Sequence, residues 1–224
     1  MMSRGDRSDR LPKLVLGGIE KAFRTYQTWT NGWSWLWEAP EYFVTVEVAR
    51  HLQDRLENCH INLEYSVKEA LADARSKRAG RPRKSLRRDG RFDILLSRKS
   101  GDPWCAIEVK HAVWSARAHL SADIRRLRDA VVHRNNGSTL RCGALAFYAD
   151  RAKPKKKHLT AEESLEALAK STVEVAKKIL AEDRHLRFEL HSSKFRSGND
   201  QDGPRPVATI DAQKSAKRIV VVAG

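Results

Sequence analysis

The sequence predicts an α/β protein with a mixed central β-sheet flanked by helices, and three observations support this fold class. Short apolar runs typical of strands alternate with longer segments of helical periodicity. Hydrophobic residues make up 41% of the 224 residues, which is enough to build a substantial core. Three of the predicted strands follow one another as a meander before the chain returns to helix, a pattern typical of a mixed sheet.

The apolar spacing places the individual elements. Helical periodicity predicts helices at 11–29, 40–57, 118–134 and 160–183. Strand-like runs occur at 60–66, 91–97, 104–110, 140–148, 186–191 and 217–223. Gly17 and Gly18 lower the helix propensity of the first helix. We divide the chain into an N-terminal helical and tryptophan-rich segment, 1–37, and a main domain, 38–224.

The excess of basic over acidic residues indicates which class of partner the protein binds. Lysine and arginine number 43 against 28 aspartate and glutamate residues, so the formal net charge is +15. This excess favours a polyanionic partner, nucleic acid before a membrane. No apolar run approaches the roughly 18 residues that span a bilayer, and the N-terminus lacks the apolar core of a signal peptide. With three widely spaced cysteines and no paired spacing, we expect a cytoplasmic protein with reduced thiols.

Two segments carry basic residues that suit a nucleic-acid backbone. The loop 75–91 holds nine basic residues and one acid, so it is expected to be solvated. Its stretch "KRAGRPRK" is similar to an AT-hook, whose Arg-Pro core lies in a narrow minor groove. A purely solubilising loop is the alternative. The helix 118–134 turns apolar residues inward and arginines outward. The predicted nucleic-acid contacts are Arg78, Arg81, Arg83, Lys84, Arg87, Arg88, Arg125 and Arg128.

Tryptophan is concentrated before the second helix. Four of the six tryptophans lie between Trp29 and Trp37. We favour a packing collar around the helix that follows. The alternative is a surface on which bases stack.

The stretch "RFDILLSRKSGDPWCAIEVKH" carries the strongest indication of chemistry. A turn near 99–102 makes it a hairpin and places Asp93 nearly opposite Glu108. Strand alternation puts Glu108 and Lys110 on one face and Ile107 on the other. Two close acids raise each other's pKa unless a cation lies between them, and Mg²⁺ prefers carboxylate oxygen and water.

In this interpretation the backbone carbonyl of Ile107 adds a further metal ligand. Lys110 then faces a bound water or a phosphate, where it orients the nucleophile or stabilises developing charge. The alternative is a structural salt bridge in which Lys110 neutralises both acids.

This arrangement resembles the PD-(D/E)XK nuclease superfamily over roughly residues 38–150. In that pattern Asp93 takes the place of the aspartate, Glu108 the second acid and Lys110 the lysine, although Phe92 stands where a proline usually precedes the aspartate. The resemblance implies a restriction-endonuclease-like core. It also implies a first core helix, here "APEYFVTVEVARHL", that often supplies an extra glutamate to the metal.

The helical wheel favours Glu41 as that ligand. Glu41 falls at the edge of the apolar side, which we assign to Tyr42, Val46, Ala49, Leu52 and Leu56. Glu47 falls among the polar residues and is kept in reserve. The alternative for Glu41 is a helix N-terminal charge favoured by the dipole. His111 points away from Lys110 by strand alternation and is not assigned a catalytic role.

Together these features predict a Mg²⁺-dependent nuclease, with Mn²⁺ as a substitute, that cuts DNA rather than RNA. The resemblance allows a role in prokaryotic defence or restriction and allows a homodimer or larger complex. Two alternatives stay open. One is a catalytically inactive nucleic-acid-binding module, and the other is a basic subunit whose partner carries the activity.

Overall fold

The computed structural model describes residues 4–75, 84–86, 89–132, 137–149, 160–181, 183, 186–193, 206–207 and 218–223. The α/β fold class and the mixed sheet are confirmed. Helix α3 and strand β6 were not predicted. The helices are α1 (Arg4–Trp29), α2 (Glu41–Gln53), α3 (Val67–Asp73), α4 (Ser121–Val132) and α5 (Ala161–Leu180), with short turns η1 (Leu36–Glu38), η2 (Lys84–Leu86) and the π-helical η3 (Ala116–Leu120). The strands are β1 (Cys59–Ser66), β2 (Arg91–Arg98), β3 (Pro103–Lys110), β4 (Cys142–Phe147), β5 (Arg187–Ser193), β6 (Pro206–Val207) and β7 (Arg218–Ala223).

The strands form one seven-stranded sheet in the order β1-β2-β3-β4-β7-β5-β6. Strands β1, β2 and β3 form an antiparallel meander, and β3, β4, β7 and β5 run parallel. In the β2–β3 hairpin Ile94 lies opposite Ile107, which is the register that the sequence predicted. Continuing this register by one residue places Asp93 opposite Glu108.

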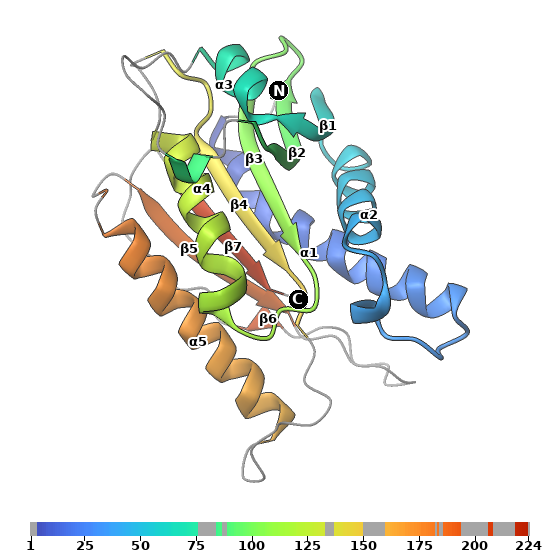
Figure 1. Cartoon of the computed structure of the whole chain (residues 1–224). Helices are drawn as coiled ribbons and strands as arrows, with labels where there is room; N and C mark the ends of the chain where they lie inside the picture. The colour runs from blue at the N-terminus through green and yellow to red at the C-terminus, as the bar shows by residue number, and fades with distance from the viewer. Residues whose placement is uncertain are drawn as a thin grey trace.

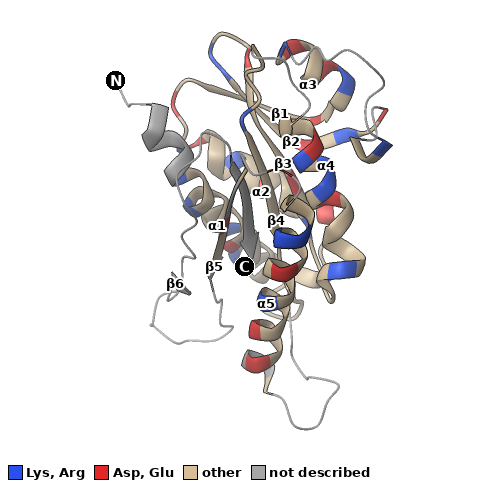
Figure 2. Ribbon diagram, turned by 90° about the vertical axis from the view of Figure 1, so that its left-hand side faces the viewer, with Lys and Arg blue, Asp and Glu red and all other residues tan. Residues whose placement is uncertain are grey.

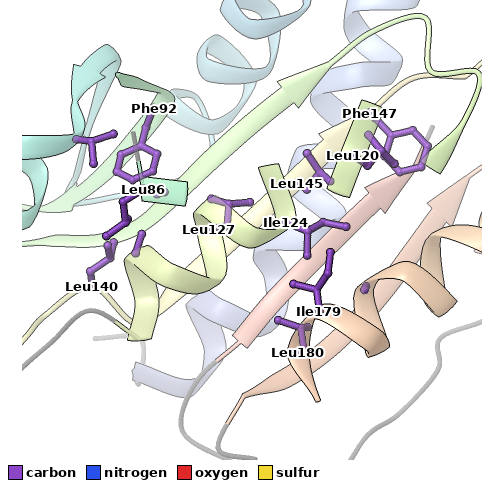
Figure 3. Close-up of a cluster of buried hydrophobic side chains, with 14 of the residues drawn as sticks. Leu86, Phe92, Leu120, Ile124, Leu127, Leu140, Leu145, Phe147, Ile179 and Leu180 are labelled. Carbon is purple, nitrogen blue, oxygen red and sulfur yellow. The ribbon is translucent and has the colours of Figure 1, made fainter. Parts of the chain in front are cut away.

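Helices cover both faces of the sheet (Figure 1). Helices α4 and α5 lie on one face, where their apolar side chains form a core with those of the strands. Figure 3 shows this core, in which Ile124 and Leu127 of α4 lie near Leu145 of β4. Helices α1 and α2 cover the other face, and their apolar residues share a second core with β2, β3 and β4. Helix α1 therefore packs into the same structure as the helix and strands that carry the predicted site.

Gly18 allows α1 and α2 to approach closely. A Cβ atom at Gly18 would lie 2.8 Å from the backbone Cα of Val48 in α2. At the neighbouring Gly17, a Cβ atom would lie 2.8 Å from the ring nitrogen Nε2 of His51, at the end of a side chain that can rotate away. The glycines that weaken the helix in isolation are thus accommodated by tertiary packing.

We expect Gly18→Ala to destabilise the protein by about 1–3 kcal/mol, because the added methyl group forces the α1 and α2 backbones apart. Gly17→Ala is the matched control. It should be nearly neutral, since His51 can move and alanine favours the helix by about 1 kcal/mol. Urea unfolding of both variants measures the difference. Equal stability of the two variants would contradict the close contact at Gly18.

The predicted apolar face of α2 is partly wrong. The buried residues of this helix include Val44, Val48, Leu52 and also Glu47, whereas Tyr42 is exposed. The reason is that α1 covers the side of α2 that the wheel assigned to solvent. The hydroxyl group of Thr25 in α1 donates a hydrogen bond to the carboxylate oxygen Oε2 of Glu47 at 3.4 Å.

Two further features bear on the sequence predictions. None of the described helices is long and apolar enough to cross a membrane. None of Cys59, Cys105 and Cys142, all among the described residues, forms a disulfide, and burial raises the pKa of the Cys105 thiol well above its ordinary value.

Candidate functional site

Asp93 and Glu108 lie on adjacent antiparallel strands at the end of the sheet away from the hairpin turn. The carboxylate oxygen Oδ2 of Asp93 accepts a hydrogen bond from the backbone N–H of Val109 at 2.6 Å. Burial raises the pKa of Asp93, and this effect outweighs the lowering by the Val109 hydrogen bond and by the charge of Lys110. The carboxyl group is therefore held where its negative charge is poorly solvated.

Glu108 is the more deeply buried of the two acids. Its side chain is 1% exposed, and burial together with the charge of Asp93 raises its pKa well above the ordinary value. Arg126 of α4 partly compensates, with Nη1 lying 3.2 Å from Oε1 of Glu108. The two groups are not aligned for a hydrogen bond, so Oε1 accepts none within the described part of the chain. A buried carboxylate oxygen is left with spare capacity for a cation.

Arg126 is held by two other contacts. Its Nη2 donates to the backbone carbonyl of Arg91, and its guanidinium lies 5.2 Å from the centre of the Phe92 ring. The side chain thus crosses from α4 to the start of β2, beside Asp93. Its positive charge lies beside the buried carboxylate of Glu108.

Lys110 reaches across to the first turn of α2. Its Nζ donates to Oε1 of Glu41 at 2.9 Å. The other carboxylate oxygen of Glu41 accepts from the backbone N–H of His111 and lies 3.3 Å from Nδ1 of the same residue. Helix α2 has no side-chain cap, so Glu41 is turned toward the end of β3 and not toward its own helix.

The ionisation of this cluster follows from its contacts. Burial raises the pKa of Glu41. The hydrogen bonds from Lys110 and His111 and the charge of Lys110 lower it, and together they outweigh the effect of burial, so the net shift is downward. Burial lowers the pKa of Lys110, but its hydrogen bond to Glu41 and the charges of Glu41 and Asp93 raise it above the ordinary value overall. Both groups are therefore charged at neutral pH.

Strained backbone flanks these residues. The neighbours of Glu64 in β1, Leu63 and Tyr65, pair with the neighbours of Asp93 in β2, so Glu64 lies across from Asp93. Glu64 has φ of +50°. Ala112, directly after His111, has φ of +51°. Residues other than glycine seldom adopt a positive φ, and those that do cluster at functional sites.

The predicted nucleic-acid contacts divide into three groups. Lys84 and Arg125 are exposed, as expected. The prediction that Arg128 points outward is wrong, because α5 covers that side of α4. Arg128 is buried, its Nη1 donates to the carbonyl of Ile179 at 2.9 Å, and its Nη2 lies 2.8 Å from Oδ1 of Asp129. The others lie outside the described residues: Arg78, Arg81, Arg83, Arg87 and Arg88.

A basic groove lies between α4 and α5. It has a volume of about 650 Å³, and positive residues outnumber the single acid, Glu174, in its lining. Figure 2 shows basic residues along α4. Arg128 also lines the groove, although its guanidinium is engaged by Ile179 and Asp129. The exposed cations of the groove are Arg117, Arg125 and Lys178.

The structure does not bring the whole predicted ligand set together. Among the described residues no three His, Cys, Asp or Glu side chains lie close enough to hold a metal ion. Glu41 is instead engaged by Lys110 and His111. Ile107 is paired on both sides, with Ile94 and Ala144, so its carbonyl lies within the sheet. Asp93 and Glu108 still fit Mg²⁺, which binds through one or two carboxylates and retains several waters.

Sequence reasoning missed Arg126 and His111. The helical pattern was used to place Arg125 and Arg128 on a solvated face and left Arg126 unassigned, and the only signal for Arg126 was the presence of acids on the neighbouring strand. His111 was set aside by strand alternation. That rule does not apply to it, because β3 ends at Lys110.

Comparison with protein-family models, with curated proteins and with solved structures found no match to this chain.

Proposed function

We propose that the chain is a Mg²⁺-dependent nuclease that hydrolyses phosphodiester bonds in DNA, built on a restriction-endonuclease-like core. The observation that carries the proposal is the register of the β2–β3 hairpin. It places Asp93 opposite Glu108, with Lys110 two residues further on and held by Glu41. The order of α2, the β1–β3 meander, α4 and the parallel strand β4 supports the resemblance noted above.

The proposed roles follow from the chemistry and contacts of each group. Asp93 and Glu108 would hold Mg²⁺, which neutralises charge on the phosphate and activates water. Lys110 is charged at neutral pH, so it stabilises negative charge growing on the phosphate and does not act as the base. Glu41 orients the ammonium group of Lys110 through the 2.9 Å contact. The exposed cations of the α4–α5 groove add affinity for the backbone that does not depend on sequence.

Cleavage of supercoiled plasmid tests the proposal. The purified protein is incubated with Mg²⁺, with Mn²⁺ and with EDTA, and the plasmid forms are separated on a gel. We expect cleavage with either metal and none with EDTA. A linear and a nicked plasmid and a single-stranded circle should be included, so that a preference among forms of DNA is not mistaken for inactivity.

Mg²⁺ should also stabilise the folded protein. At about one hundred times its dissociation constant, a ligand that binds only the folded state adds about 2.7 kcal/mol. We expect Mg²⁺ to raise the melting temperature of the wild type, and to have no effect on Asp93→Asn, which removes one of the two carboxylates. Glu47→Gln is the matched control, because Glu47 faces Thr25 and Arg50 and should leave the metal response intact. An unchanged melting temperature of the wild type would argue against a metal site.

A catalytically inactive nucleic-acid-binding module is the second candidate. The contact that favours it is the one between Arg126 and Glu108, because a guanidinium already supplies positive charge to the buried acid. This candidate expects DNA binding that is independent of Mg²⁺ and no cleavage of any form of DNA. The metal response in thermal unfolding separates the two candidates without relying on a cleavable substrate.

A further inference from the structure

Large aromatic side chains are exposed around the candidate site. Trp33 is 87% exposed, and Trp114 and Tyr42 are each about half exposed. The sequence analysis favoured a packing collar for the tryptophans between Trp29 and Trp37, which is wrong for Trp33. We define the aromatic surface as Trp33, Trp35, Trp37, Tyr42 and Trp114.

Trp29 is the exception, because it packs on another ring. Its centroid lies 4.9 Å from that of Phe43 in α2, and Tyr26 contacts the same ring at 5.7 Å. Part of the tryptophan-rich segment thus does form a collar. Further along, Trp33 faces solvent and Trp35 and Trp37 are 37% and 39% exposed, while Leu36 between them is buried in the core.

The aromatic surface borders the site from two directions along the chain. Tyr42 is the neighbour of Glu41, and Trp37 precedes Glu41 by four residues. Trp114 follows Lys110 by four residues. Four residues reach at most about 14 Å, and Lys110 and Glu41 are joined by a 2.9 Å ion pair. Trp37, Tyr42 and Trp114 therefore come within a few nucleotides of the proposed position of the phosphate, and Trp33, eight residues before Glu41, lies at most about 28 Å from Glu41.

The net charge of the protein indicates which class of molecule binds the aromatic surface. The chain carries a formal net charge of +15, and the site itself presents the ammonium group of Lys110. Exposed aromatic side chains on a chain of this net positive charge suit a polyanion that also offers flat rings, which is nucleic acid. In a duplex the faces of the bases are already covered by their neighbours. Only unpaired bases can stack on protein side chains without first leaving the helix.

We propose that the aromatic surface stacks unpaired bases beside the candidate site, so that the substrate is DNA with a single-stranded stretch next to the cleaved phosphate. The proposal rests on the proposed nuclease function and names its substrate class. Single-stranded DNA and a duplex with a single-stranded flap both satisfy it, and a blunt duplex does not.

Binding measured in EDTA tests the proposal without requiring cleavage. Fluorescence anisotropy is recorded with a labelled single strand, a blunt duplex of equal length and the same duplex carrying a flap. We expect the single strand and the flap to bind more tightly than the blunt duplex, and to quench tryptophan fluorescence. Trp33→Ala and Trp114→Ala should each weaken single-strand binding about 5- to 150-fold, and leave duplex binding unchanged.

Two matched variants serve as controls. Trp33→Phe keeps an aromatic face and should retain most of the affinity. Trp104→Phe alters a partly buried tryptophan at the opposite end of β3, about 20 Å from Lys110, and should change nothing. Circular dichroism verifies that each variant is folded.

The outcomes separate this proposal from the nuclease proposal. Equal binding of blunt duplex and single strand, with Trp33→Ala and Trp114→Ala unaffected, overturns the stacking surface even if the protein cleaves DNA. Loss of single-strand binding in these variants supports it, and complete absence of cleavage would then overturn only the nuclease function. If the wild type sediments as a dimer and Trp33→Ala as a monomer, a second copy covers the surface and the proposal is overturned.

Discussion

Lys110→Ala should reduce the rate of DNA cleavage by about 10²- to 10³-fold, the effect of removing one charged donor from a site that stabilises a transition state. The side chain is only partly buried and its main partner, Glu41, is near the surface, so the fold should survive. The rate is measured on plasmid with saturating Mg²⁺. Because the contacts with Glu41 raise the pKa of Lys110 above its ordinary value, deprotonation of this lysine should not lower the wild-type rate between neutral and moderately alkaline pH.

Two companion variants make this result specific. Lys99→Ala removes an exposed lysine from the turn at the other end of the same hairpin and should leave the rate nearly unchanged. Glu41→Gln removes the partner that holds the ammonium group, and should lower the rate less than Lys110→Ala does. If Lys110→Ala cleaves as fast as the wild type, the nuclease site is not here.

Arg126→Ala should destabilise the protein by about 3–5 kcal/mol, because it leaves the carboxylate of Glu108 buried without its cation. Urea unfolding in EDTA measures the loss. The folded-state pKa of Glu108 already lies above its ordinary value, so the stability from its protonation is present below that value and is lost as pH rises through the raised pKa. Removing Arg126 raises the pKa further, and the destabilisation should therefore be smallest in acid and largest at alkaline pH.

The adjacent Arg125 supplies the matched control. It lies on the same helix but is exposed, so Arg125→Ala should change stability by less than about 0.5 kcal/mol. Adding Glu108→Gln to Arg126→Ala should recover part of the lost stability, because no buried charge then remains. Additive losses in this double variant would show that Arg126 stabilises the fold through Arg91 and Phe92 and not through Glu108.

Features that depend on residues close together in the sequence could be predicted, whereas contacts between distant elements could not. The register of the hairpin follows from a turn of a few residues, and so the pairing of Asp93 with Glu108 was predictable. Glu41 contacts Lys110 at the site, whereas Glu47, which the wheel placed on the polar side, is buried against α1. Whether Glu41 binds a metal stays a prediction.

The errors arise where a second helix covers the first. A helical wheel distinguishes an apolar side from a polar side, but it cannot show that α1 buries Glu47 or that α5 buries Arg128. The contact between Arg126 and Glu108 has the same origin, since it joins α4 to β3 across the core. The exposure of Trp33 could not be inferred either, because tryptophan is common both in cores and at binding surfaces.

The position of β7 bears on the order in which the protein assembles. This last strand lies between β4 and β5 and pairs in parallel with both. Strand β5 is therefore made before the neighbour that joins it to the rest of the sheet, and it has to wait until residues 218–223 leave the ribosome. The first four strands need no such wait, because they span residues 59–147. The residues of the candidate site can thus come together while the far half of the sheet is still unpaired.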